Sequence, residues 1–165
     1  MHKHLEEQVE ATRQFLSFQL AGEEYAIDIL QVQEIRDSAL PTLIPNSPNY
    51  IDGVLNLRGE IIPVINLRSR FGLSQNTAQK NRIVIVVNVA SAGKNRLMGL
   101  LVDAFSETYD VPLSDIKPAP PGISIIDDEF IIGLTTVEER MLILLDAEVL
   151  LNSNELSLNI NENIA

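Results

Sequence analysis

Two apolar runs that enclose a short polar turn form the clearest pattern of hydrophobic and polar positions in the chain. Residues 53–57 and 61–65 are largely apolar, and Arg58-Gly59-Glu60 separates them. The glycine of this triplet can adopt the positive φ that a tight turn between two strands often needs. Asn66, which follows the second run, is a residue type that often begins a helix. The pattern therefore predicts a β-hairpin and then a short helix over residues 67–71.

The same pattern returns in the second half of the chain. Residues 133–145 repeat the hairpin, and Asp146 takes the position of the cap Asn66. Residues 24–35 and 97–108 form a second similar pair. The distance between the copies is far longer than the period of a solenoid repeat. Two similar small β domains side by side are the simpler interpretation, and chance similarity between apolar segments is the alternative.

Other segments predict short strands, brief helices and irregular connections. Asp28 is expected to cap a helix that ends near Ile35 and carries a narrow apolar stripe. The prolines within residues 40–48 and 112–122 predict irregular segments. Further strands are expected at residues 15–20, 24–27, 82–89, 96–102 and 108–111.

Many short strands with only brief helices are typical of an all-β fold built from barrels or sandwiches. Because the pattern occurs twice, we expect two barrels, each small enough to need a shared hydrophobic core where they meet. The polar stretch of residues 74–81 is interpreted as the linker between them. The expected organisation is a flexible N-terminal segment (residues 1–13), a first barrel (14–80), a second barrel (81–151) and a polar C-terminal tail (152–165).

Composition narrows the classes of function. The 165 residues include no cysteine, so disulfides, thiolate metal sites and cysteine nucleophiles are excluded. The net charge of −11, most of it in the second half, would repel nucleic acid and anionic membrane surfaces. The N-terminus has no signal-peptide pattern, and the apolar runs are too short to span a bilayer. Other proteins are therefore the expected partners, and the alternative is that the acidic charge serves solubility alone.

Residue types with catalytic or metal-binding chemistry form no recognisable motif. Glycine-rich phosphate loops, HExxH, GxSxG and paired cysteines are absent from the sequence. His2 and His4 lie at the N-terminus, where a solvated end is a simpler interpretation than a metal site. Asp127-Asp128-Glu129 could hold a cation, but three consecutive carboxylates point in different directions, so a solvated turn is favoured. No enzyme activity, metal or cofactor is expected, and a small β-barrel enzyme that uses acidic residues is the alternative.

The repeated hairpins differ in charge at one position of a shared face. The positions on that face are Val54, Asn56 and Arg58 in the first hairpin and Leu134, Thr136 and Glu138 in the second. The apolar position is kept while the charge is inverted, which indicates that the two halves have different surfaces. Arg58 could pair with Glu34 beside an apolar patch. The alternative is a solvated turn arginine that contributes little.

Several of these segments are similar to one family of proteins. They are residues 18–20 (FQL), 24–29 (EYAIDI), 32–35 (VQEI), 53–59 (GVLNLRG) and 63–68 (PVINLR), with 130–133 (FIIG) and 140–146 (RMLILLD) in the second half. Together they resemble CheW, the coupling protein family of bacterial chemotaxis, over roughly residues 15–151. The stretch from residue 53 to 67 is the most specific part of this resemblance.

The resemblance implies two SH3-like five-stranded β-barrels packed around a shared hydrophobic core, without enzyme activity or cofactor. It implies a cytoplasmic adaptor associated with membrane-bound receptor arrays. The implied partners are the cytoplasmic tip of methyl-accepting chemoreceptors and the regulatory domain of the histidine kinase CheA. The receptor-binding residues carried over from the family pattern are Val32, Glu34, Gly53, Val54 and Arg58. Kinase contacts are expected on exposed loops at the barrel ends, one from each half, without assigned residues. The alternative is the same domain within a CheV-type or CheA-type protein.

Overall fold

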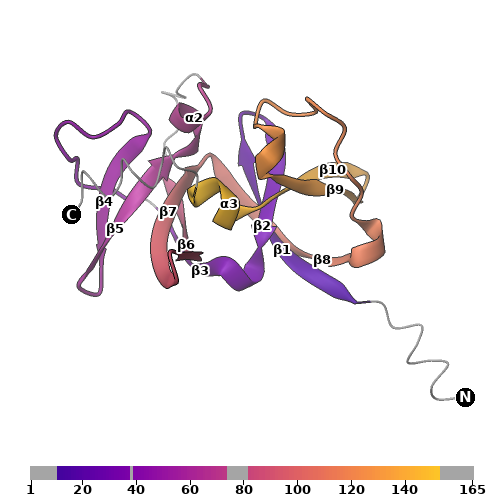
Figure 1. Cartoon of the computed structure of the whole chain (residues 1–165), viewed down its shortest axis with the longest axis horizontal. Coiled ribbons are helices and arrows are strands. Elements are labelled where there is room, and N and C mark those ends of the chain that lie inside the picture. The colour runs from indigo at the N-terminus through magenta and orange to yellow at the C-terminus, as the bar shows by residue number, and fades with distance from the viewer. Residues whose placement is uncertain (1–10, 38, 74–81, 153–165) are drawn as a thin grey trace, which may run out of the picture.

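The computed structural model describes residues 11–37, 39–73 and 82–152. Within these ranges, ten strands form two five-stranded sheets (Figure 1). The strands of one sheet, called barrel A, are β1 (Thr12–Leu20), β2 (Glu23–Asp28), β8 (Ala104–Pro112), β9 (Ile131–Val137) and β10 (Arg140–Leu145). Those of the other, called barrel B, are β3 (Val32–Arg36), β4 (Ile51–Leu57), β5 (Glu60–Asn66), β6 (Ile83–Ser91) and β7 (Lys94–Val102).

Short helices connect the strands. The α-helices are α2 (Leu67–Arg70) and α3 (Ala147–Leu151), and the 3-10 helices are η1 (Ile29–Gln31), η2 (Leu113–Asp115) and η3 (Asp128–Phe130). In the part of the chain that the structure describes, no helix is long and apolar enough to cross a membrane. The predicted all-β fold with brief helices is confirmed.

The two barrels are copies of one strand pattern. The strand order is β8-β1-β2-β10-β9 in barrel A and β3-β6-β7-β5-β4 in barrel B, so β1 corresponds to β6 and β3 to β8. Each sheet contains one parallel pair, β2 with β10 and β5 with β7. Equivalent isolated bridges join Thr42 to Val54 and Lys117 to Leu134. The structure thus confirms the predicted duplication.

The predicted boundary between the barrels, after residue 80, is wrong. Barrel A combines residues 12–28 with 104–145, whereas barrel B is formed by strands between residues 32 and 102. The prediction took neighbours in the sequence for neighbours in space, but β2 pairs with β10 rather than with β3. The described strands on either side of residues 74–81, β5 and β6, belong to the same barrel.

Three local predictions are also wrong. Asp28 caps only the single turn η1, with Leu30 N donating to its Oδ1 at 2.9 Å, and Val32 begins strand β3 instead of continuing a helix. Strand β8 begins at Ala104, ahead of the strand expected at residues 108–111, and β1 begins at Thr12, within the predicted flexible segment. In each case the backbone pairs with a neighbouring strand, and this tertiary pairing outweighs the local signal.

The predicted helix starts after the two hairpins are confirmed. Oδ1 of Asn66 accepts a hydrogen bond from the amide of Ser69 at 3.2 Å. Oδ1 of Asp146 accepts one from the amide of Val149 at 3.0 Å. The predictions for His2 and His4, for residues 74–81 and for the tail from residue 153 lie outside the described residues.

Apolar side chains from both barrels form one shared core. Phe18 and Tyr25 of barrel A are fully buried, and Ile85, Met98 and Leu100 of barrel B belong to the same cluster. The rings of Phe18 and Tyr25 stack with their centroids 6.0 Å apart. Side chains on the opposite faces of the strands fill a smaller core within each barrel, because successive residues of a strand point to opposite sides. The expected shared core is confirmed.

Arginine–aspartate pairs hold the two places where the chain passes between the barrels. The first passage follows β2, where Nη2 of Arg13 lies 2.9 Å from Oδ2 of Asp28. The second is Asp103, whose carboxylate oxygens accept hydrogen bonds from Nε and Nη2 of Arg68 at 2.8 and 2.6 Å. Asp103 also accepts one from the backbone amide of Ala21 at 2.9 Å. Because Arg68 follows a strand of barrel B and Ala21 lies in a turn of barrel A, this carboxylate ties the barrels together.

Replacement of Asp103 by asparagine should lower the free energy of unfolding at pH 7 by about 1–2 kcal/mol. Burial alone raises the pKa of Asp103, but the hydrogen bonds from Arg68 and Ala21 hold this pKa below its usual value. Such a carboxylate stabilises the fold above its unfolded-state pKa of about 4, and the stabilisation is lost as the pH falls through the folded-state pKa. Urea unfolding should therefore separate wild type from Asp103→Asn at pH 7, and the difference should shrink in acid.

A matched control for this experiment is Asp110→Asn, which alters an exposed carboxylate on β8. It should change the unfolding free energy by less than about 0.5 kcal/mol at either pH. Equal stability of Asp103→Asn and wild type at pH 7 would show that the tie contributes nothing to folding.

Candidate partner-binding surface

The hairpin of β4 and β5 presents Arg58 at its tip. Arg58 and Gly59 have φ values of 50° and 89°, as in the two-residue turns that match the twist of paired strands. Oδ1 of Asn56 accepts a hydrogen bond from the amide of Gly59 at 2.9 Å, which fixes the turn. The side chain of Arg58 is 69% exposed, so most of it faces solvent.

Arg58 pairs with Glu34, as predicted from the sequence. Nη2 of Arg58 lies 2.7 Å from Oε1 of Glu34, and Nη1 of Arg36 lies 3.5 Å from the other carboxylate oxygen. The hydrogen bond from Arg58 holds the pKa of Glu34 below its usual value. Glu34 lies on strand β3, not on a helix. Because β3 and β4 are the opposite edges of the sheet, this pair joins the two edges of barrel B.

The other three predicted receptor-binding residues lie on the same two strands. Val32 on β3 is partly buried and packs against the shared core. Val54 on β4 is partly buried, and its backbone exchanges hydrogen bonds of 2.8 and 2.9 Å with Thr42. Gly53 is buried, and a Cβ there would lie 2.5 Å from the carbonyl oxygen of Thr42. Its role in the fold is therefore to let this neighbouring segment approach β4.

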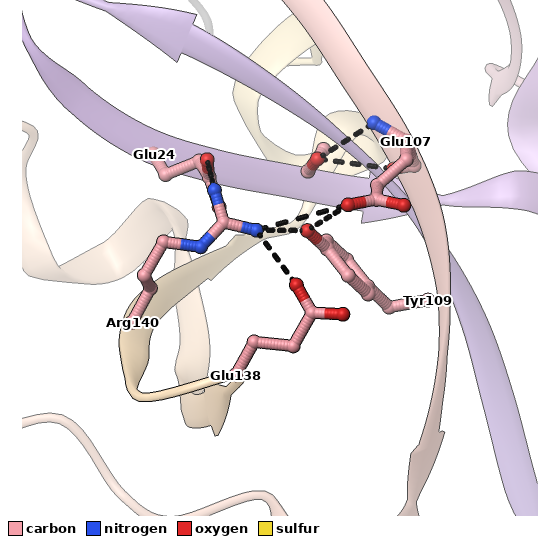
Figure 2. A network of polar contacts seen from close by, with 6 residues as sticks. Glu24, Glu107, Tyr109, Glu138 and Arg140 are labelled. Atoms are coloured by element: carbon pink, nitrogen blue, oxygen red, sulfur yellow. Dashed lines mark hydrogen bonds and ion pairs between the residues drawn. The ribbon is translucent and has the colours of Figure 1, made fainter.

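The corresponding edge of barrel A carries a larger polar network around Arg140 (Figure 2). Nη1 of Arg140 lies 2.8 Å from a carboxylate oxygen of Glu24, and Nη2 lies 3.5 Å from Glu138. Nη2 also donates to the hydroxyl of Tyr109, which in turn donates to Oε1 of Glu107 at 2.8 Å. Burial raises the pKa of Tyr109 to about 12, so the hydroxyl keeps its proton at neutral pH. Arginine at this edge is thus surrounded by three carboxylates and one phenol.

Sequence reasoning did not single out Arg140. One signal was available, because the repeat of residues 24–35 and 97–108 places Glu107 at the position of Glu34. The remaining partners come from β2, β8 and the turn between β9 and β10, and their proximity depends on pairings far apart in the sequence. The two edges therefore share a position for a carboxylate but differ in how its arginine is held.

Acidic side chains of the described residues take part in ion pairs at both edges and in a loop hydrogen bond. Among the described residues, no three His, Asp or Glu side chains are grouped so that they could hold a metal ion. Asp128, from the acidic run that could have bound a cation, accepts a hydrogen bond from the amide of Gly122 at 3.1 Å. This carboxylate fastens a loop, which is a structural task.

Comparison with known proteins places the chain in one family. The family model described as CheW-like domain matches residues 14–155. The chain belongs to the CheW-like domain family. The resemblance found in the sequence is therefore confirmed over nearly the whole described chain.

CheW proteins of several bacteria are similar to the chain over most of its length. Chemotaxis protein CheW of Klebsiella aerogenes is 43% identical over 146 residues, which are 88% of this chain and 86% of that protein. Chemotaxis protein CheW of Helicobacter pylori is 32% identical over 149 residues, 90% and 87% of the two chains. Chemotaxis protein CheV3 of Helicobacter pylori is 33% identical over 137 residues, which are 42% of its length, so a CheW-like domain also occurs in a longer protein.

A solved structure supports the fold. The crystal structure of scaffolding protein TtCheW from Thermoanaerobacter tengcongensis matches with a TM-score of 0.75 and 35% sequence identity. The match covers 87% of this chain and 95% of that one. The two-barrel arrangement is therefore the fold of a CheW protein.

Replacement of Gly53 by alanine should destabilise the fold by about 2–4 kcal/mol, because the new Cβ would meet backbone atoms that cannot move independently. The equivalent glycine of barrel A, Gly133, has the same close approach, since a Cβ there would lie 2.6 Å from the carbonyl oxygen of Lys117, but only Gly53 also has a positive φ, 148°. Gly133→Ala should therefore cost a similar amount. Chemical unfolding of both variants measures the effect.

Gly22→Ala separates backbone strain from the close approach. Gly22 has a φ of 81°, but a Cβ there would have no atom within 4 Å. Its replacement should cost only about 1 kcal/mol. If Gly53→Ala and Gly22→Ala lose equal stability, the approach of Thr42 is not the reason for glycine at position 53.

Proposed function

We propose that the protein is a non-catalytic chemotaxis adaptor. In this role it couples the cytoplasmic tips of methyl-accepting chemoreceptors to the histidine kinase CheA and helps to assemble receptor–kinase arrays. Membership in the CheW-like domain family and similarity to proteins named chemotaxis protein CheW support this function. The observation that carries the receptor contact is the pair of Arg58 and Glu34, which is closed at 2.7 Å while its arginine stays largely exposed.

The receptor contact is a helix laid on the edge of barrel B. A helical tip offers an apolar stripe with polar flanks, which is a common mode of peptide recognition. Val32 and Val54 supply apolar contacts, and Gly53 shapes the backbone beside them. Glu34 and Arg58 set the register of the helix, since rim charges contribute more to specificity than to affinity.

The kinase contact lies on exposed turns at the barrel ends, one from each barrel. The duplicated strand pattern supports this placement, because a partner with the same two-barrel fold can pack against either end. The edge that carries Arg58 then stays available to the receptor while the kinase is bound.

Arg58→Ala should weaken the binding of a receptor cytoplasmic fragment by about 10- to 100-fold, since a charge-assisted hydrogen bond across an interface is worth about 1.5–3 kcal/mol. Glu34 keeps its contact with Arg36 in this variant. Binding of the CheA regulatory domain should stay within about twofold of wild type, because that contact lies elsewhere. Isothermal titration calorimetry with each partner measures both affinities.

Lys94→Ala is the matched control, because Lys94 is an exposed cation beside the two-residue turn of β6 and β7. It should leave the affinity for the receptor fragment unchanged. A wild-type protein that binds neither partner would contradict the adaptor function. Unfolding of Arg58→Ala, or equal loss of both partners, would instead contradict the assignment of Arg58 to the receptor surface.

A further inference from the structure

A hollow of about 310 Å³ lies beside the proposed receptor surface and is formed by other residues. Its apolar lining is Leu30 of η1, Ile132 of β9 and Val149 of α3. Leu30 is 89% exposed and Val149 is 42% exposed. Exposed apolar side chains are normally scattered singly, so two at one hollow indicate a contact site. Figure 1 shows α3 between the two barrels, so the hollow lies near their junction.

The two exposed apolar residues are held in place by their own backbone amides. The amide of Leu30 donates to Asp28 at 2.9 Å, and the amide of Val149 donates to Asp146 at 3.0 Å. Both positions are therefore ordered before any partner arrives, which lowers the entropy cost of binding. Leu30 precedes Val32 by two residues, so their Cα atoms are at most about 7 Å apart. The hollow therefore lies close to strand β3, which carries Val32.

The charge left at the hollow is negative. Arg13 and Asp28 form an ion pair at 2.9 Å and neutralise each other. Asp146 and Glu148 also line the hollow. Within the described ranges, the side chain of Glu148 has no hydrogen bond or ion pair. A partner that brings a cation next to an apolar side chain would match this arrangement.

We propose that the receptor-binding surface extends from β3 across η1 to α3. The hollow takes an aliphatic side chain from a helix of the receptor tip, and a neighbouring Lys or Arg of that helix pairs with Glu148. This inference rests on the proposed function and names a second contact region for the same partner.

Three other occupants fit the hollow less well. An added β-strand needs a free strand edge, but β9 is already bridged at Leu134 by Lys117. A second copy of the chain would bring two acidic hollows together, against the repulsion of a protein with net charge −11. The chain's own tail, residues 153–165, carries Glu155 and Glu162 and no Lys or Arg, so its charge is also unfavourable.

The test is titration of full-length protein with a receptor cytoplasmic fragment that contains the tip, in wild type, Leu30→Asp and Glu148→Lys. Each variant should lose about tenfold or more in affinity, as expected when a charge enters an apolar contact or a cation meets a cation. The milder variants Leu30→Ser and Glu148→Gln should show smaller losses of affinity. Thermal unfolding checks that all variants fold. Matched controls are Leu113→Asp, on the exposed 3-10 helix η2, and Glu129→Lys, on η3; both should bind like wild type.

The outcomes separate this inference from the proposed function. If wild type binds and Arg58→Ala loses binding while Leu30→Asp and Glu148→Lys do not, the extension to α3 is overturned and the adaptor function stands. If wild type does not bind the receptor fragment at all, the proposed function itself fails. Tighter binding by Leu30→Asp would mean that a segment of the chain covers the hollow, and a wild-type dimer that this variant dissociates would mean that a second copy does. Either result overturns the inference.

Discussion

Burial of apolar side chains between the two barrels is the interaction on which the rest of the structure depends. A five-stranded barrel alone is too small to bury enough surface to offset its chain entropy. Phe18 and Tyr25 from one barrel therefore lie in the same core as Ile85, Met98 and Leu100 from the other. The chain also passes between the barrels twice, so barrel A is assembled from two separate segments that flank the continuous segment of barrel B.

Duplication gives both barrels the same frame and leaves their edges free to differ. In each barrel the edge strand, β3 or β8, carries a glutamate at the equivalent position. In barrel B, Glu34 meets an exposed arginine at the hairpin tip. In barrel A, Glu107 belongs to a network in which Arg140 is already engaged by Glu24 and Tyr109. An arginine with a single close partner has N–H groups that face solvent and can bind a ligand at little cost. An arginine whose N–H groups are already engaged by several partners cannot.

What the sequence could predict follows from the range of the interactions. The hairpins and the helix caps Asn66 and Asp146 depend on neighbouring residues. Because the pattern occurs twice in the chain, each copy supported the prediction made for the other. The contact of Glu34 with Arg58 was one of two interpretations that the sequence left open, and it was reached from their opposite charges although β3 was taken for a helix. The partner of β2 could not be predicted, because pairing with β10 depends on a strand more than a hundred residues away. The hollow at Leu30 and Val149 was missed for the same reason, since its walls come from four separate segments.

An adaptor needs surfaces whose relative position does not change when one of them is occupied. The two passages of the chain between the barrels are where such a change would begin, and each is held by an arginine on an aspartate. At the second passage, Asp103 also accepts a hydrogen bond from the amide of Ala21. A shift of one barrel would therefore break hydrogen bonds to the other barrel. Breaking a partly buried ion pair costs more than forming it gains, because each charge loses its partner away from bulk water. The contacts of Asp103 therefore do more to fix the angle between the barrels than to add stability. In the proposed function, a fixed angle keeps the edge of barrel B and the junction at α3 in one relative position.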